Sequence, residues 1–154
     1  MTHRRPPRLT DFDYLGPHRY FVTCCTLDRH EAFVRDEPAL AVRSEILRTS
    51  TACDFEEIAL VLMPDHVHAL FEGRTDAAAF IPFMTLLRQR AAVAYRRLVR
   101  RPLWQDGYHE HVLRDEERTR TVAAYIIGNP IRKQLVARVD EYPYVWCKYG
   151  LEIA

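Results

Sequence analysis

The chain has 154 residues, 48% hydrophobic and 28% charged, which is enough for one compact domain with a substantial core. The 22 basic and 21 acidic residues leave a formal net charge of +1, so charge alone neither requires nor excludes a nucleic-acid partner. No apolar run is long enough to span a bilayer and the polar N-terminus lacks a signal-peptide core, so we expect no membrane partner and a cytoplasmic location.

The first half of the chain predicts one helix between strands. Residues 1–18 are rich in proline and arginine and predict a flexible basic arm. An aromatic and β-branched run from Arg19 predicts the first strand. Apolar spacing after a first-turn proline predicts a helix over residues 36–51. The apolar segments Phe55–Met63 and His66–Glu72 flank a Pro-Asp turn and predict a hairpin.

The second half predicts two more helices around one strand. The first helix spans about Ala77 to Val99, although Pro82 indicates a later start. A strand is expected over Tyr108–Leu113. Acidic residues from 115 onward favour the start of the last helix, which should run to about residue 129. The aromatic tail, residues 138–154, is expected to pack on the body of a single domain.

The predicted order of elements is β-α-β-β-α-β followed by a helix. This order is the split βαβ pattern of ferredoxin-like folds. We therefore predict an α+β sandwich in which an antiparallel sheet carries its helices on one face.

Two histidines stand in the third predicted strand. His66 and His68 are two residues apart, so their imidazoles project from the same face of the strand. Two imidazoles held in this way can bind one divalent metal ion. The alternative is that both are ordinary polar residues on a solvated face, but a pair within so apolar a segment favours the metal site.

A second pair with the same spacing, His109 and His111, stands in the fourth predicted strand. Its polar flanks suit an exposed edge strand. In one interpretation, the shared histidine spacing is then a coincidence. It also leaves open a four-histidine metalloenzyme acting on a small molecule, although the predicted helices argue against the β-barrel that such sites occupy.

The last predicted helix carries Tyr125 and, four residues later, Asn129. Residues at this spacing share one helix face. If that face meets the histidine strand, the Asn129 amide oxygen can complete a metal site and the Tyr125 hydroxyl lies beside the ion. Spacing alone favours the alternative, in which Tyr125 is a core residue and Asn129 simply ends the helix before Pro130.

The motifs together resemble a known family. The segment MPDHVHAL resembles the histidine–hydrophobe–histidine (HUH) motif of single-strand DNA endonucleases. YIIGNPIRKQLV is similar to the Tyr-Ile-x-x-Asn-Pro-Val-Arg-x-x-Leu-Val signature of REP-associated tyrosine transposases. RYFVTCCTLDR and LWQDGYHEHVLRDEE resemble that family's first strand and the segment between its two motifs, so the resemblance covers residues 17–150.

The resemblance implies an HUH endonuclease fold and a metal-dependent nuclease and strand-transferase that uses Mg²⁺ or Mn²⁺. By matching motifs, His66, His68 and Asn129 become the metal ligands. Tyr125 becomes the nucleophile that forms a 5′-phosphotyrosine at DNA hairpins or palindromic repeats. Asp65 departs from the family's usual asparagine. The implied partner is single-stranded or hairpin DNA, without a small-molecule cofactor, and the protein is expected to be a monomer or homodimer.

Further residues are candidates for binding DNA, because arginines can follow phosphates and aromatic rings can stack on bases. They are Arg4, Arg5, Arg8, Arg88, Arg90, Arg97, Trp104, Tyr108 and His111. For the helix arginines the alternative is a solvated face, and for the aromatic residues it is core packing. A hairpin-binding regulator that does not cleave DNA is the alternative function.

Overall fold

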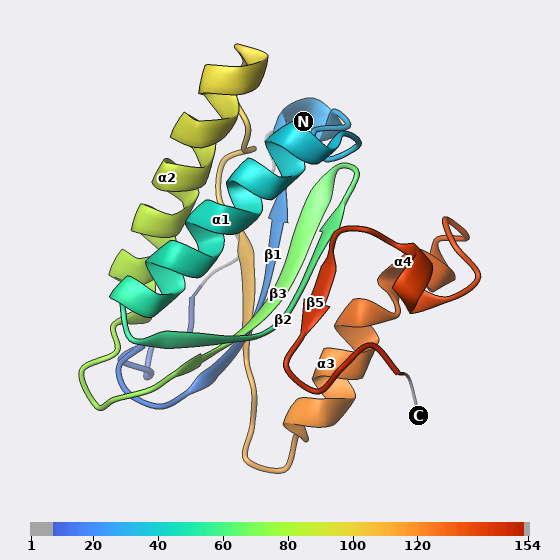
Figure 1. Ribbon diagram of the computed structural model, residues 1–154. Helices are drawn as coiled ribbons and strands as arrows, with labels where there is room; N and C mark the ends of the chain where they lie inside the picture. The colour runs from blue at the N-terminus through green and yellow to red at the C-terminus, as the bar shows by residue number, and fades with distance from the viewer. Residues whose placement is uncertain (1–7, 153–154) are drawn as a thin grey trace.

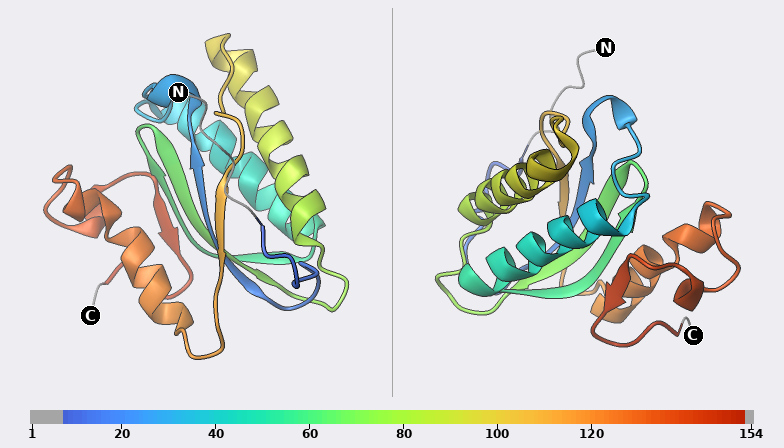
Figure 2. Two further views of the ribbon diagram at one scale, coloured as in Figure 1. Left: turned by 180° about the vertical axis from the view of Figure 1, so that it is seen from behind. Right: turned by 45° about the horizontal axis from the view of Figure 1, so that its top comes forward.

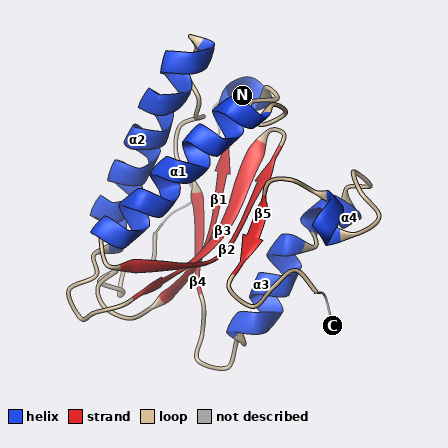
Figure 3. Cartoon of the chain, in the orientation of Figure 1, coloured by secondary structure: helices blue, strands red, loops and turns tan. Residues whose placement is uncertain are grey.

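The computed structural model describes residues 8–152 and contains a five-stranded antiparallel sheet with helices packed on it (Figures 1 and 3). The strands are β1 (Arg19–Cys25), β2 (Phe55–Met63), β3 (His66–Gly73), β4 (His109–Val112) and β5 (Val145–Cys147). The helices are α1 (Asp36–Ala52), α2 (Phe80–Val99), α3 (Thr119–Ile127) and α4 (Asn129–Arg132), with single 3₁₀ turns at Leu27–Arg29 and Val139–Glu141.

The sheet has the order β4-β1-β3-β2-β5, and every neighbouring pair is antiparallel. The first four strands, with α1 and α2 in the two crossovers, form the predicted β-α-β-β-α-β unit. The predicted α+β fold class is therefore confirmed. The tail adds β5 at the β2 edge, which sequence analysis did not predict as a strand.

The helices cover both faces of the sheet, which corrects the prediction that they lie on one. α1 and α2 pack together on one side, whereas α3 packs mainly over β2, β3 and β5 on the other (Figures 1 and 2). Side chains along β3 alternate between the two covered faces of the sheet. Phe71 contacts Phe83 of α2 on one face, while His66 lies beside Asn129, directly after α3, on the other. The strand interiors are apolar on both faces because both are covered.

Aromatic side chains fill the core between the sheet and α2. Tyr20 and Phe80 stack with ring centroids 3.8 Å apart, and Phe55 stacks on Phe83 at 4.3 Å. All four rings are almost completely buried, so each contributes on the order of 2–3 kcal/mol of hydrophobic stabilisation. This layer provides the rigid support for the strand that carries the first histidine pair.

Two predicted helix starts differ from the structure. α2 begins at Phe80, as Pro82 indicated, because at the third helical position the proline removes only an N–H that has no partner within the helix. α3 begins at Thr119 rather than at residue 115, since the preceding acidic residues form a turn in which Glu117 accepts a hydrogen bond from the Arg114 backbone N–H. No helix among residues 8–152 has the length and hydropathy of a transmembrane span.

The described part of the predicted arm, residues 8–18, is folded onto the body. Tyr14 is buried, its hydroxyl donates to Glu110 at 3.1 Å, and its backbone oxygen accepts from Phe80. Residues 1–7 lie outside the described residues. At the other end, residues 138–152 lie against the body through β5 and through Tyr142, whose hydroxyl donates to the Leu62 carbonyl at 2.5 Å.

Candidate active site

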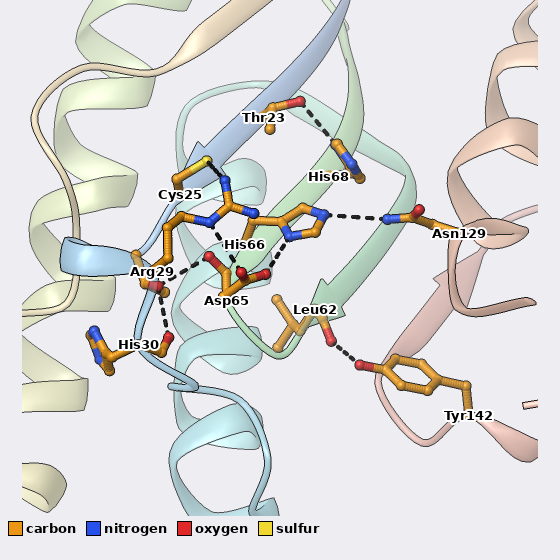
Figure 4. A network of polar contacts seen from close by, with 11 residues as sticks. Thr23, Cys25, Arg29, His30, Leu62, Asp65, His66, His68, Asn129 and Tyr142 are labelled. Carbon is orange, nitrogen blue, oxygen red and sulfur yellow. Dashed lines mark hydrogen bonds and ion pairs between the residues drawn. The ribbon is translucent and has the colours of Figure 1, made fainter. Parts of the chain in front are cut away.

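The pair His66 and His68 opens β3, directly after the turn from β2. Both side chains project from the face that α3 covers, and their ring centroids are 4.7 Å apart (Figure 4). His66 is only 8% exposed, so the pair is not on a solvated surface. The predicted convergence of the two imidazoles is therefore present in the fold.

The His66 ring is fixed by a carboxylate. Its Nδ1 lies 2.7 Å from Asp65 Oδ1, and Asp65 Oδ2 accepts a hydrogen bond from Arg29 Nε at 3.0 Å (Figure 4). Burial favours a higher Asp65 pKa, but the hydrogen bonds from His66 and Arg29 lower it overall. Since the carboxylate accepts the Nδ1 proton, Nε2 carries the lone pair of the ring, as in the carboxylate–histidine pairs of metal sites.

His68 is oriented from the neighbouring strand. Its Nδ1 lies 2.8 Å from the hydroxyl oxygen of Thr23, which is its cross-strand partner. Burial lowers the pKa of His68 to about 4, and the nearby His66 and Arg132 charges act in the same direction. Burial also lowers the pKa of His66. Both rings are therefore neutral at physiological pH, the form in which imidazole binds a metal.

Asn129 closes the site from the layer of helices α3 and α4, which faces the histidines across the sheet surface. Its Nδ2 lies 3.3 Å from His66 Nε2, and the residue is 4% exposed. α3 ends at Ile127 and α4 begins at Asn129, so the predicted single helix is broken at Gly128 and Pro130 falls in the first turn of α4. Pro130 thus starts a helical turn instead of ending the helix, because a first-turn proline needs no N–H partner.

Tyr125 lies one helical turn before Asn129, at the edge of the site. Its side chain is not a core residue, since it is 55% exposed. The Phe21 ring contacts both Tyr125, at 6.2 Å between centroids, and His68, at 5.5 Å. The nucleophile predicted from the motif, the two histidines and the amide are thus gathered in one chain.

The donor set at this point suits a divalent metal ion. Two neutral imidazoles and one carboxamide converge, and a half-turn of the Asn129 amide exchanges its nitrogen for its oxygen. Nitrogen and amide-oxygen donors are compatible with Mn²⁺, whereas Mg²⁺ prefers oxygen donors and relies on water and substrate phosphates to complete its shell. The residues present therefore fit the predicted ion.

The second pair is on the same sheet face but in different surroundings. His109 pairs with Thr23 and His111 with Phe21 across the β1–β4 ladder, and both histidines are exposed. His111 Nε2 lies 2.9 Å from Glu117. Residues 8–152 contain no cluster of three or more His, Cys, Asp or Glu side chains suited to a metal, so nothing there supports the four-histidine alternative.

Three of the candidate DNA-binding residues serve the fold. The Arg88 guanidinium donates to the Gln105 carbonyl at 2.7 Å and lies over the rings of Trp104 and Tyr108. The Trp104 indole donates to the Arg88 carbonyl, and Tyr108 is 5% exposed. The Tyr108 ring therefore faces the core and is not available to stack on a base, which corrects that prediction.

Among the described residues, the remaining arginine candidates do not gather at the histidine site. Arg90 and Arg97 line a surface groove between α1 and α2, on the side of the sheet opposite α3. Arg8 lies near Tyr14, which packs against Phe80 of α2. The predicted contacts of Arg4 and Arg5 fall outside the described residues. A DNA strand bound at Tyr125 would reach Arg90 and Arg97 only by passing round the domain.

Several residues that shape the site were not predicted from the sequence. Asp65 was noted only as a departure from a motif, although its place beside His66 was a signal. Arg132, whose guanidinium lies 4.0 Å from the Tyr125 ring centroid, was visible within the matched signature. Thr23 and Arg29 gave no local signal, since only the sheet register and a loop bring them to the histidines.

Comparison with known families now places the chain. The model of the family described as "Transposase IS200 like" matches residues 16–129, which contain both histidine pairs, Tyr125 and Asn129. The chain belongs to this family. Since transposases process DNA, the protein is a DNA-processing enzyme, and the resemblance to REP-associated tyrosine transposases is confirmed.

Individual relatives agree with this family. A Haemophilus influenzae protein classed as a REP-associated tyrosine transposase is 29% identical over 143 residues, covering 86% of this chain and 81% of the relative. The structure of a REP-associated tyrosine transposase bound to a REP hairpin matches with a TM-score of 0.75 at 20% identity, over 91% of this chain and 82% of the other. A Deinococcus radiodurans structure described as a transposase matches at 0.56 and 22% identity, over 82% and 98%.

Proposed function

We propose that this transposase is a divalent-metal-dependent single-strand DNA endonuclease and strand-transferase. It cleaves at hairpins or palindromic repeats and forms a 5′-phosphotyrosine through Tyr125. The observation that carries the proposal is the contact between Asn129 and His66, at 3.3 Å, which joins the helix bearing Tyr125 to the histidine strand. The hairpin bound to the structural neighbour supports hairpin DNA as the partner.

In the cleavage step, the Tyr125 hydroxyl oxygen attacks the phosphorus of the scissile phosphodiester and loses its proton to solvent. The bond between phosphorus and the 3′ oxygen breaks, and that oxygen takes up a proton to leave a free 3′-OH. The phosphotyrosine retains the energy of the broken bond. A 3′-OH can therefore attack the phosphotyrosine and join strands, with Tyr125 as the leaving group.

His66, His68 and the Asn129 amide would hold Mn²⁺ or Mg²⁺. When bound, the ion would neutralise charge on a non-bridging phosphate oxygen and align the bond to be broken. Asp65 and Thr23 hold the two imidazoles in orientations that leave one nitrogen of each ring free of these hydrogen bonds. The 55% exposure of Tyr125 leaves its hydroxyl accessible to a strand from solvent.

The test uses hairpin oligonucleotides taken from palindromic repeats beside the gene and labelled at the 3′ end. With Mn²⁺ or Mg²⁺, the wild type should give a labelled covalent band that survives denaturing electrophoresis. EDTA should abolish the band, and so should Tyr125→Phe. Tyr149→Phe is the matched control, because Tyr149 also lies beside an arginine, with its ring 4.2 Å from the Arg120 guanidinium.

Two outcomes would count against the proposal. A covalent band from Tyr125→Phe would show that another residue is the nucleophile. Tight hairpin binding by the wild type without any band, in either metal, would favour the alternative function of a hairpin-binding regulator.

A further inference from the structure

The Tyr125 side chain has few partners. Its edge-to-face contact with Phe21 restrains one side of the ring. Among residues 8–152, no side chain makes a hydrogen bond with its hydroxyl, so no general base of the described chain is in place. A phenol that must attack phosphorus needs another means of orientation and of charge stabilisation.

Arg132 makes the close contact on the ring of Tyr125. Its guanidinium carbon lies 4.0 Å from the ring centroid, and its Nη2 donates to the Tyr125 backbone oxygen at 2.6 Å. Because the Arg132 guanidinium contacts both the ring and the backbone oxygen of Tyr125, it fixes the Tyr125 ring relative to the Tyr125 backbone. Tyr125, Asn129 and Arg132 are spaced i, i+4 and i+7, which places them on one face of the α3–α4 segment.

The Arg132 charge lies close to the ring of the nucleophile, with its guanidinium carbon 4.0 Å from the Tyr125 ring centroid. A positive charge in this position stabilises negative charge that develops on the Tyr125 oxygen, because opposite charges a few ångströms apart attract each other.

We propose that Arg132 is a positioning residue for the nucleophile, which holds the Tyr125 ring and stabilises the oxygen's negative charge as it attacks and as it leaves during strand joining. This inference rests on the proposed function of Tyr125. It differs from a role in folding or in holding DNA, and each role predicts a different pattern of effects.

The first experiment measures single-turnover formation of the covalent band and, separately, hairpin affinity. Arg132→Gln should slow the reaction about a hundredfold, a loss typical of a displaced reacting group, with hairpin affinity and melting temperature unchanged. Arg132→Lys should be intermediate, since it keeps the charge but not the planar contact. Arg120→Gln, which removes the analogous arginine over Tyr149, should react like the wild type.

Chemical rescue provides a sharper criterion. Millimolar guanidinium should restore part of the Arg132→Ala rate, whereas sodium chloride at the same ionic strength should not. A loss of hairpin affinity with an unchanged reaction rate would overturn the proposal and make Arg132 a phosphate contact. Equal losses from Arg120→Gln and Arg132→Gln would also overturn it.

A readout independent of activity separates this inference from the proposed function. With 3-fluorotyrosine at position 125, Arg132→Gln should shift and narrow the fluorine resonance as the ring becomes mobile, while Arg120→Gln should leave it unchanged. An unchanged resonance in Arg132→Gln would refute positioning even if the wild type cleaves DNA. If the wild type forms no covalent band but Arg132→Gln still shifts the resonance, the proposed function is refuted. The contact between Arg132 and the Tyr125 ring is then still supported.

Discussion

The two histidine pairs have the same spacing and lie on the same face of the same sheet, yet their surroundings differ. His68 and His109 are both cross-strand partners of Thr23. The pair on β3 lies beneath α3 and α4, where His66 meets Asn129. The pair on β4 lies on the edge strand and is exposed, and His111 contacts Glu117. The spacing determines the direction of the side chains, and the covering helix determines which pair can form a site.

Burial accounts for the chemical contrast. Under α3 the imidazoles are kept neutral and each is held by one designated partner, Asp65 or Thr23. On β4, the His111 side chain is itself 52% exposed where it contacts Glu117, and such exposed pairs contribute little energy. Buried side chains that are already oriented bind a metal better than mobile, hydrated ones, because binding costs them less conformational entropy.

The largest expected effect comes from removing one imidazole of the pair on β3. His66→Ala or His68→Ala should reduce metal-dependent formation of the covalent band about a thousandfold, since the phosphate loses its charge neutralisation. The double variant His109→Ala with His111→Ala should stay within about threefold of the wild type. Single-turnover assays and Mn²⁺ titration calorimetry measure both. Similar losses from the two pairs would revive a four-histidine site.

Stability should depend on pH through the buried pair. The His68 pKa of about 4 lies below its ordinary value of 6.5, so the unfolded chain binds more protons between these pH values. Stability present above pH 6.5 is therefore lost as pH falls toward 4, by as much as about 3 kcal/mol. Urea unfolding in EDTA at pH 7, 5.5 and 4 should show a weaker pH dependence for His68→Asn than for the wild type.

The matched control for pH is His109→Asn, which removes an exposed imidazole and should keep the wild-type dependence. If His68→Asn and His109→Asn follow the same curve, then burial does not distinguish the pairs and the contrast between them fails.

The smallest expected effect concerns the carboxylates behind the two pairs. Asp65→Asn should weaken Mn²⁺ binding about tenfold, because the amide no longer carries the charge that increases the basicity of His66. Glu117→Gln, which alters the carboxylate beside His111, should leave Mn²⁺ binding unchanged. Calorimetry on both variants tests this, and equal affinities for Asp65→Asn and the wild type would remove Asp65 from the site.

Local patterns predicted most of the fold. The bounds of β2 and the start of α1 agree with the predictions because a continuous apolar run, helical apolar spacing and a first-turn proline act within a few residues. The break at Gly128 was missed because the helical spacing of Tyr125 and Asn129 continues almost unchanged across it. The start of α3 was missed because acidic residues favour a turn as readily as a helix start.

Predictions about surfaces failed where packing had to be known. Arg88, Trp104 and Tyr108 have the composition of a DNA-binding surface, but they pack on one another beside α2. Arg90 and Arg97 do lie at the surface, on the face away from Tyr125. Composition reports which residues can contact DNA, whereas their position relative to the reacting group depends on the whole chain.

The sequence by itself determined the order of the elements, the shared direction of His66 and His68, and the family to which the motifs belong, because these depend on spacing within short segments. Only the tertiary structure decided that α3 covers the second face, that Asn129 meets His66 across 63 residues of chain, and that Arg132 lies over Tyr125. The reason is physical: spacing sets the direction of a side chain, but its partners are set by the packing of distant elements.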